Sequence, residues 1–383
     1  MPSIEPPDDD RAMCDWLRLI RSSNVGPIGF FQLLGRFGSA ARAIEELPAL
    51  AERGGRSGGK SQIKLCTEQD PRREFNAALD FGAHWIALGS PAYPASLAAI
   101  ADPPPRLAVK GDPSLLSRPI LAIVGARNAS ASGRQFTRGI AADLGCAGFV
   151  IASGLARGID GAAHTGAIEH GTIGVIAGGI DVVYPPEHQE LQGRIGGRGA
   201  LVSETRFGTK PQARHFPRRN RLVSGLARDV LVVEAALKSG SLIAARLAAE
   251  QGRDVFAVPG SPRDPRARGS NDLIRQGATL VEHANDILRA LEFGVPDSSA
   301  TVAAPITIDQ PEKDDADSYG EPAELGSGRT TINDLLSPTP VEVDELVRQS
   351  HLTPSAVLTI LLELELAGRL VRHPGNRVSI KTN

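Results

Sequence analysis

The segment at residues 120–160 constrains the fold of this 383-residue chain more than any other. It begins with a short apolar run, partly β-branched, that ends at Gly125, and a second apolar run at residues 149–152 ends at Ser153. A helix-length stretch, residues 132–147, separates the two runs. Strand, small-residue turn, helix, strand and a second small-residue turn form the opening βαβ unit of a doubly wound parallel sheet. We therefore predict an α/β domain built around this unit.

Further short apolar runs continue this pattern, each separated from the next by a helix-length segment. They lie at residues 172–177, 200–202, 230–233, 255–258 and 278–281. Runs that are apolar on both faces are typical of a parallel sheet covered by helices. With the first two runs they give seven candidate strands. Two more candidates, at residues 85–88 and 107–109, are predicted to extend the same sheet.

The two turns of the βαβ unit carry the residues expected of an anion site. In a parallel sheet such turns lie at the carboxyl ends of the strands, where glycines let an anionic group approach backbone N–H donors and a helix N-terminus. Gly125 and Arg127 belong to the first turn, and Ser153, Gly154 and Arg157 belong to the second. The first turn lacks the Gly-x-Gly-x-x-Gly pattern of dinucleotide sites. We predict a sheet that binds phosphate groups.

The most basic segment of the chain, residues 204–234, lies between two predicted strands. Its centre reads Phe216-Pro217-Arg218-Arg219-Asn220-Arg221, without an acidic residue. A charged run is often only a solvated surface, but we favour anion binding here because the other turns of the sheet also carry glycine and arginine.

A further candidate follows at Lys238-Ser239-Gly240-Ser241, where a lysine, two hydroxyls and a glycine precede an alanine-rich helix. Such a start offers N–H donors beside a cation. The stretch is not a Walker A loop, so it gives no indication of ATP hydrolysis.

Charge is unevenly distributed, although the formal net charge is only -2. Residues 118–292 hold 22 Lys+Arg against 16 Asp+Glu, whereas residues 293–325 hold 1 against 8. The Pro- and Ser-rich composition of residues 293–328 predicts an acidic linker. The three scattered cysteines suggest neither a disulfide framework nor a zinc cluster, which fits a reducing compartment. With no secretory signal and no apolar run long enough to span a bilayer, we expect a soluble, cytoplasmic protein.

Candidate acid–base residues are few. Asp160 and His164 are four residues apart on a predicted helix, but we interpret Asp160 as a helix cap and His164 as the partner of a neighbouring group. Glu204 and Glu234, at strand ends, are the best candidates for an acid pair. In a phosphate site, such acids are better suited to orienting arginines. We therefore predict a site without catalysis, metal or cofactor.

Each end of the chain is predicted to form a small helical module. Near the N-terminus, two helix-like patterns flank Gly26-Pro27-Ile28-Gly29, as in a helix–hairpin–helix unit, which can grip a nucleic-acid backbone through loop N–H groups. Because this hairpin has no Lys or Arg, we favour a helical domain whose glycines only terminate helices. At the C-terminus, three helices and a hairpin around Pro374-Gly375-Asn376 predict a winged helix. Its third helix, residues 353–367, carries leucines and glutamates where a DNA reader needs basic residues, so we favour a protein-contact module.

The ordered motifs resemble those of the DNA-processing protein A (DprA, also called Smf) family. They are Val124-Gly125-Ala126-Arg127, Ser153-Gly154-Leu155-Ala156-Arg157-Gly158-Ile159-Asp160, Phe216-Pro217-Arg218-Arg219-Asn220-Arg221, Val232-Val233-Glu234-Ala235, Lys238-Ser239-Gly240-Ser241 and Phe256-Ala257-Val258-Pro259-Gly260. The resemblance spans roughly residues 85–281 and implies an extended Rossmann-like domain that dimerises. We place an N-terminal helical domain, SAM-like or helix–hairpin–helix-like, at residues 1–80. The Rossmann-like domain follows at 81–292, the linker at 293–328 and the winged helix at 329–383.

The resemblance also implies a function. It is that of a bacterial cytoplasmic protein that binds single-stranded DNA taken up in natural transformation, shields it and helps to load the RecA recombinase. Carried over by motif, the DNA-binding residues are Gly125, Arg127, Ser153, Gly154, Arg157, Arg218, Asn220, Arg221, Lys238, Ser239, Gly240 and Ser241. Ala126 departs from the serine that members commonly have there, which removes one hydroxyl donor from the first turn.

Two other functions stay open at this point. A nucleotide-processing enzyme of the phosphoribohydrolase type shares the fold, but its Pro-Gly-Gly-x-Gly-Thr motif is replaced here by Ala236-Leu237-Lys238-Ser239-Gly240-Ser241. A structural adaptor would depend on the C-terminal module. For single-strand binding, cations are plentiful but aromatics near the basic turns are limited to Tyr184, Phe207 and Phe216. We therefore predict binding dominated by phosphate contacts, with weak base preference and strong salt dependence.

Overall fold

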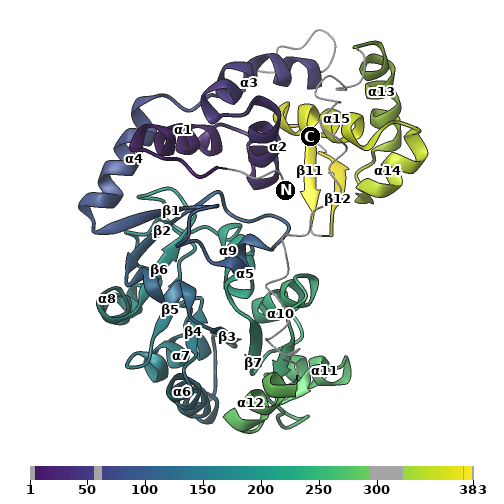
Figure 1. Cartoon of the computed structure of the whole chain (residues 1–383). Coiled ribbons are helices and arrows are strands. Elements are labelled where there is room, and N and C mark those ends of the chain that lie inside the picture. The colour runs from purple at the N-terminus through teal and green to yellow at the C-terminus, as the bar shows by residue number, and fades with distance from the viewer. Residues whose placement is uncertain (1–4, 56–62, 294–321, 374, 382–383) are drawn as a thin grey trace. The chain divides into compact units, whose positions relative to one another are not determined.

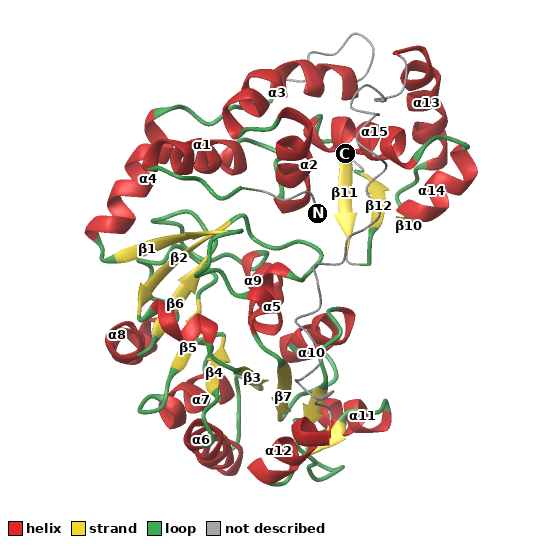
Figure 2. Ribbon diagram, in the orientation of Figure 1, coloured by secondary structure: helices red, strands yellow, loops and turns green. Residues whose placement is uncertain are grey.

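The computed structural model describes residues 5–55, 63–293, 322–373 and 375–381. The chain forms two compact units, one made of Met1–Arg72 with Thr301–Asn383 and the other of Arg73–Ala300. The two end modules therefore share one unit, although the sheet domain separates them in the sequence. Figure 1 labels the elements of both units, and Figure 2 colours them by type. Within the described ranges, no helix is long and apolar enough to cross a membrane.

The second unit is built on a nine-stranded sheet with the order β1-β2-β6-β5-β4-β3-β7-β8-β9. The strands are β1 Ala83–Ala87, β2 Arg106–Gly111, β3 Ile120–Gly125, β4 Val150–Ser153, β5 Thr172–Val175, β6 Ala200–Ser203, β7 Asp229–Val233, β8 Val255–Ala257 and β9 Thr279–Leu280. All the predicted strands are present close to their predicted positions. Strands β4 to β7 are buried along their whole length, because helices cover both faces.

Strands β1 and β2 extend the main sheet, as predicted, but they do so in the antiparallel direction. β1 pairs with β2 and β2 with β6 in antiparallel register, whereas all pairings from β6 to β9 are parallel. The proline-rich residues 91–105 form only one short helix, α5 (Ala95–Ala98), between β1 and β2. A parallel pair needs a longer crossover connection. The sheet is thus parallel-rich with an antiparallel edge that the sequence pattern did not indicate.

Helices pack on both faces of this sheet. α6 (Ala131–Cys146) and α7 (Ile159–Ala167) lie side by side against β3 and β4, and α12 (Ala284–Phe293) packs beside α6 (Figure 1). α9 (His215–Leu226) and α10 (Gly240–Glu250) pack together and contact β3 and β7. The other elements of this part of the chain are α4 (Gln69–Asp80), which crosses the boundary between the units, η1 (Pro113–Ser117), η2 (Pro186–His188), α8 (Gln189–Arg198) and α11 (Arg268–Arg275).

The first unit combines the two predicted end modules. The N-terminal helices are α1 (Asp10–Arg21), α2 (Pro27–Phe37) and α3 (Ala40–Gly54), and the C-terminal module consists of α13 (Pro322–Leu335), β10 (Val341–Glu342), α14 (Val343–Ser350), α15 (Pro354–Leu366), β11 (Leu370–His373) and β12 (Arg377–Ile380). Local chemistry sets these helix starts. The side chains of Asp9 and Thr353 accept backbone N–H groups at the starts of α1 and α15, and Pro27 opens α2. The winged helix is present as predicted. The favoured interpretation of the N-terminal glycines as helix terminators was wrong, because Gly26 is the N-cap of α2 and Gly29 lies within that helix.

The predicted linker is partly helical. Helix α13 begins at Pro322, inside the segment 293–328 that its composition assigned to a linker. Ala, Glu and Leu directly after Pro322 are good helix formers, and proline is favoured in a first helical turn. The acidic cluster and the rest of that predicted linker, residues 294–321, lie outside the described residues.

The last residue of β3 shows why a glycine is needed at the first turn. A Cβ atom added to Gly125 would lie 1.9 Å from the carbonyl oxygen of Val233, its partner on β7. We expect Gly125→Ala to lower the free energy of unfolding by about 2 kcal/mol, because the sheet must open to admit the methyl group. Gly139→Ala is the control, since Gly139 lies on α6 with no atom within 4 Å of an added Cβ. That control should gain about 0.5–1 kcal/mol from helix propensity. Urea denaturation measures both, and equal stability of Gly125→Ala and the wild type would contradict the close approach.

Candidate nucleic-acid interface

The predicted turns meet where the strand order of the sheet reverses. The chain leaves β3 for β4 on one side, and it crosses from β6 to β7 on the other side of β3. In doubly wound sheets, ligands bind in the crevice outside the carboxyl ends of the strands at this switch point. Gly125 ends β3, Ser153 ends β4 and Val233 ends β7, so three predicted segments begin at this one edge.

The first and second turns touch each other through their backbones. The N–H of Ile159 donates to the carbonyl oxygen of Ala126 at 3.2 Å. Gly158 has φ of 75°, and a Cβ added to it would lie 2.2 Å from the same oxygen. The glycine is therefore required by both its left-handed backbone and the close approach. The two turns form one continuous backbone surface.

Four predicted cations at this edge have exposed side chains: Arg127, Arg157, Arg218 and Lys238. Arg127 lies close to the start of α9, with its guanidinium carbon 5.1 Å from the centre of the Phe216 ring. Arg157 is paired with Glu187, and both side chains remain about half exposed. A pair so open to solvent contributes little to stability and can exchange its carboxylate for another anion.

An exposed aromatic ring, Tyr184, and a half-buried one, Phe216, lie together near Arg127. The Phe216 and Tyr184 ring centres are 5.5 Å apart, and Tyr184 is 43% exposed. Phe207 instead packs edge-on against Phe81, so it is not part of this group. The sequence alone could not tell which of these three aromatic residues lie together. Tyr184 and Phe216 are neighbours because the fold brings the loop after β5 next to the start of α9.

The start of α10 has the predicted arrangement of small polar groups. The Ser239 hydroxyl accepts the N–H of Ser241 at 3.3 Å and lies 2.7 Å from its hydroxyl oxygen. Asn220 donates from its side-chain amide to the carbonyl of Gly240 at 3.2 Å. Asn220 therefore ties α9 to the beginning of α10, and Lys238 stands exposed beside a helix N-terminus.

Arg219, in the middle of the basic run, is buried and has a structural role. Its guanidinium donates to the carbonyl of Val175 at 3.3 Å, and a Cβ at Gly154 would lie 1.4 Å from the same nitrogen. The charge of nearby Asp160 compensates it in part, and burial lowers the pKa of Arg219 while it raises the pKa of Asp160. Glycine at position 154 thus makes room for an arginine that supports the second turn from inside.

Arg221 also points inward. Its guanidinium pairs with Glu204, and its Nε lies 3.2 Å from a carboxylate oxygen of Asp102. A third bond runs to the backbone carbonyl of Asp102 at 2.8 Å. Arg221 is 8% exposed, so a phosphate would have to break these bonds to reach it. We leave Arg221 out of the interface.

Ser153 and Glu234 serve the scaffold as well. Ser153 is fully buried and donates its hydroxyl to the carbonyl of Ile123 at 2.6 Å. Glu234 has φ of 50°, and its carboxylate accepts the backbone N–H of Ser130 at 2.9 Å, next to the start of α6. Glu204 and Glu234 therefore do not form an acid pair, since each is bonded to a different partner. The prediction that these acids orient arginines agrees with the pairing of Glu204 with Arg221, whereas the hydrogen bonds described for Glu234 come from Ser130.

His164 is bonded to a neighbouring group, as predicted, but Asp160 is not the cap of its helix, because Gly158 is the N-cap of α7 and no side chain caps it. The Asp160 carboxylate accepts the N–H of Ala156 at 3.2 Å, and the His164 Nδ1 lies 2.7 Å from the Thr172 hydroxyl. Burial lowers the pKa of His164 to about 3, so the imidazole is neutral in the folded protein. No cluster of metal-binding side chains is found in the parts of the chain that the structure describes.

The buried imidazole of His164 should make the free energy of unfolding fall at acid pH. Its pKa is lower in the folded state than in the unfolded state, so its stabilising effect is complete above about pH 6.5 and is lost as the pH falls towards 3. Between pH 6 and pH 5 the unfolding free energy of the wild type should fall by about 1 kcal/mol more than that of His164→Gln. Denaturant titrations at both pH values measure this difference. Exposed His84→Gln is the control, and an unchanged pH slope in His164→Gln would contradict a neutral, buried His164.

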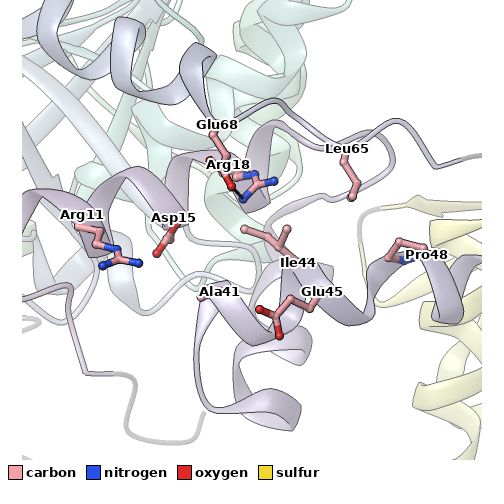
Figure 3. Close-up of a pocket in the computed structure, with 9 residues that line it drawn as sticks. All are labelled: Arg11, Asp15, Arg18, Ala41, Ile44, Glu45, Pro48, Leu65 and Glu68. Atoms are coloured by element: carbon pink, nitrogen blue, oxygen red, sulfur yellow. Dashed lines mark hydrogen bonds and ion pairs between the residues drawn. The ribbon is translucent and has the colours of Figure 1, made fainter.

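Two other features of the chain do not fit a phosphate site. A hollow of about 370 Å³ on the N-terminal helices holds three acids and two arginines (Figure 3). It is lined by Arg11, Asp15, Arg18, Ala41, Ile44, Glu45, Pro48, Leu65 and Glu68.

A Gly-x-x-x-x-Gly-Lys-Ser pattern, which matches the Walker A motif, occurs elsewhere in the chain at residues 54–61. It follows helix α3 instead of a strand, residues 56–62 lie outside the described residues, and a P-loop requires the strand.

Together, the fold and its carboxyl edge define a doubly wound α/β protein with a cationic surface at the switch point. Comparison with known proteins gives the family. The model of the DNA recombination-mediator protein A family matches residues 84–292, the DprA-like N-terminal HHH domain matches residues 10–77 and the DprA winged helix domain matches residues 316–376. The chain belongs to the DNA recombination-mediator protein A (DprA/Smf) family.

Relatives and solved structures agree with this assignment. The chain is 38% identical to Protein Smf of Escherichia coli over 81% of its own length and 82% of that protein, and 47% identical to the DNA processing protein DprA of Bacillus subtilis over 61% and 82%. An X-ray structure of DprA from Streptococcus pneumoniae superposes with a TM-score of 0.60 at 34% identity, covering 72% of this chain and 97% of that one. A DprA structure from Helicobacter pylori, described for its single-stranded DNA binding mode, gives 0.50 at 31% identity over 55% and 96%.

Proposed function

We propose that this protein binds single-stranded DNA along the carboxyl edge of its sheet. The observation that carries the proposal is the convergence of exposed Arg127, Arg218 and Lys238 around two joined glycine turns and the N-terminus of α10. Backbone N–H groups, a helix N-terminus and flexible cations are the groups that bind phosphates. The relative from Helicobacter pylori, which binds single-stranded DNA, supports the same ligand class.

The direct test is binding of a fluorescent oligonucleotide, single-stranded and duplex in parallel, over a series of salt concentrations. Each phosphate contact to a single strand contributes about -0.7 to the slope of log affinity against log salt. We expect preference for the single strand and a steep slope, because several cations contact phosphates. Equal or negligible binding of both forms would refute the proposal.

Base contacts are proposed for Tyr184 and its neighbour Phe216. Tyr184 is 43% exposed and its ring lies beside Phe216, which in turn lies close to Arg127. Stacking of a base on an aromatic ring contributes about 1–3 kcal/mol, so Tyr184→Ala should weaken single-strand binding by about tenfold. Tyr184→Phe keeps the ring and should bind like the wild type. Competition binding measures both, and equal loss in the two variants would assign the effect to the hydroxyl instead of the ring.

The biological role that we propose is the one the family implies. The protein would shield single-stranded DNA taken up in natural transformation and help to load the RecA recombinase, in the cytoplasm and without a reaction of its own. The test is RecA filament assembly on protein-coated single strands. Assembly should be faster with the wild type than with a variant that cannot bind DNA, and equal rates would contradict the loading role.

We also propose that the sheet domain mediates a homodimer. β9 stands at the end of the sheet order, and Leu280 on this strand is 44% exposed. An edge strand with an exposed apolar side chain can pair with another copy. Light scattering should give the mass of a dimer for the wild type and of a monomer for Leu280→Glu. A monomeric wild type would refute this proposal and leave DNA binding untouched.

A further inference from the structure

Helix α15, the third helix of the winged helix, is buried on more than one side. Eight of its 13 residues are buried. The winged-helix core accounts for one side, since Val357, Ile360, Leu361 and Leu364 belong to it. The opposite residues Leu362, Glu363 and Leu366 are also at most 2% exposed. A helix that is also buried on the side opposite its own core needs a second partner.

That partner is the N-terminal helical domain, which belongs to the same compact unit. A Cβ added to Gly54, at the end of α3, would lie 2.0 Å from the carbonyl oxygen of Glu363. The backbones of α3 and α15 therefore touch, and only glycine allows it. Two hydrogen bonds join the domains beside this contact. Asn24 donates to the carbonyl of Leu366 at 3.0 Å, and Arg369 donates to the carbonyl of Gly54 at 3.1 Å.

The same contact covers the hairpin at the start of α2. Leu362 approaches to 3.5 Å of a Cβ built on Gly29, and the Glu365 carboxylate oxygens lie 3.6 Å and 3.7 Å from Cβ positions built on Gly26 and Gly29. Arg372 holds this carboxylate at 2.8 Å and also reaches Gln32 at 3.4 Å. A negative group of the chain itself thus lies at the N-terminal end of α2, the position that favours a phosphate in a helix–hairpin–helix unit.

Neither surface has the charges that a DNA-binding surface needs. The hairpin Gly26-Pro27-Ile28-Gly29 has no cation of its own, and the two acids of α15, Glu363 and Glu365, are paired with Arg329 and Arg372. A helix that reads DNA needs basic or amide side chains on the face it presents. Both departures from nucleic-acid-binding patterns are explained if each surface is shaped to receive the other.

We propose that α15 is the resident ligand of the N-terminal hairpin, with Glu365 in the place of a phosphate and Leu362 beside it. The two end modules of one chain then form a single closed body, and neither the hairpin nor the third helix contacts DNA. This inference does not depend on the binding function proposed for the sheet.

Hydrogen exchange on the full-length protein tests the docking. Gly54→Val places a side chain against the α15 backbone, and Gly54→Ala is a milder version in case the first variant does not fold. Glu52→Val is the control, because Glu52 is exposed on the same helix. We expect exchange of residues 26–33 and 357–366 to rise together by about tenfold or more in both Gly54 variants, with no change in β3 or in the control. A rise confined to α3, or no rise, would overturn the proposal.

The second arm adds single-stranded DNA to the wild-type protein. We expect protection of residues 125–130 and 237–243, at the sheet edge, and unchanged exchange at residues 26–33. Protection of the hairpin by DNA would overturn the docking proposal. Failure of the proposed DNA-binding function is distinguishable, because it would appear as no protection at the sheet edge while the Gly54 variants still decide the docking.

Discussion

Replacing Arg127 and Lys238 together by alanine is expected to weaken single-strand binding by about a hundredfold at moderate salt. Each of these exposed cations is placed to contact a phosphate, and a hydrogen bond to a charged group is worth about 1.5–3 kcal/mol. The slope of log affinity against log salt should fall by about 1.4, because two phosphate contacts are lost. A fluorescent oligonucleotide titrated at several salt concentrations measures both quantities.

Arg198→Ala is the matched control for this prediction. Arg198 is exposed on α8 directly before β6, at the amino end of the strands, where it pairs with Glu169. Removing it changes the net charge by the same amount per residue without touching the proposed interface. If Arg198→Ala weakened binding as much as Arg127→Ala or Lys238→Ala alone, the effect would come from overall charge, and the assignment of the site would be wrong.

Arg221→Ala is expected to lower the free energy of unfolding by about 3 kcal/mol. The substitution removes the arginine that pairs with both Glu204 and Asp102, and breaking a buried ion pair on one side costs about 3–5 kcal/mol. Asp102 is 38% exposed, which reduces the cost towards the lower limit. Urea denaturation measures the loss of stability.

Arg218→Ala supplies the comparison on the same helix. Arg218 is exposed at the start of α9, so its removal should leave stability nearly unchanged and weaken DNA binding about tenfold. Arg221→Ala, measured at a temperature where it is folded, should bind DNA within twofold of the wild type. The opposite pattern, with a stable Arg221→Ala that no longer binds DNA, would return Arg221 to the interface.

The sheet domain was predictable because its signals are local. Buried parallel strands appear as short apolar runs, and a glycine marks each turn where a backbone passes closely, as at Gly125 and Gly158. The antiparallel edge was not predicted, because strand direction depends on the length and path of a connection. Helix α13 was not predicted either, because its helix-forming residues lie in a segment whose overall composition is that of a linker.

The candidate site was predictable as a place but not residue by residue. The run Arg218-Arg219-Asn220-Arg221 reads as one basic patch, yet the helix turns each side chain about 100° from the last. Arg218 consequently faces solvent, Arg219 supports the second turn and Arg221 enters an ion-pair cluster. Ser153 is similarly unavailable, because it ends a strand that is buried along its whole length and donates its hydroxyl to the carbonyl of Ile123.

The sequence by itself determined which elements form and where the glycine-containing turns lie, because periodicity, glycine and helix caps act over a few neighbouring residues. Only the tertiary structure decided which arginines are available, that Tyr184 stands beside Phe216, and that the hairpin near the N-terminus receives a helix near the C-terminus. Asn24 and Leu366 are 342 positions apart in the chain. No local pattern encodes such a contact, since it arises only when two separately formed surfaces bury each other.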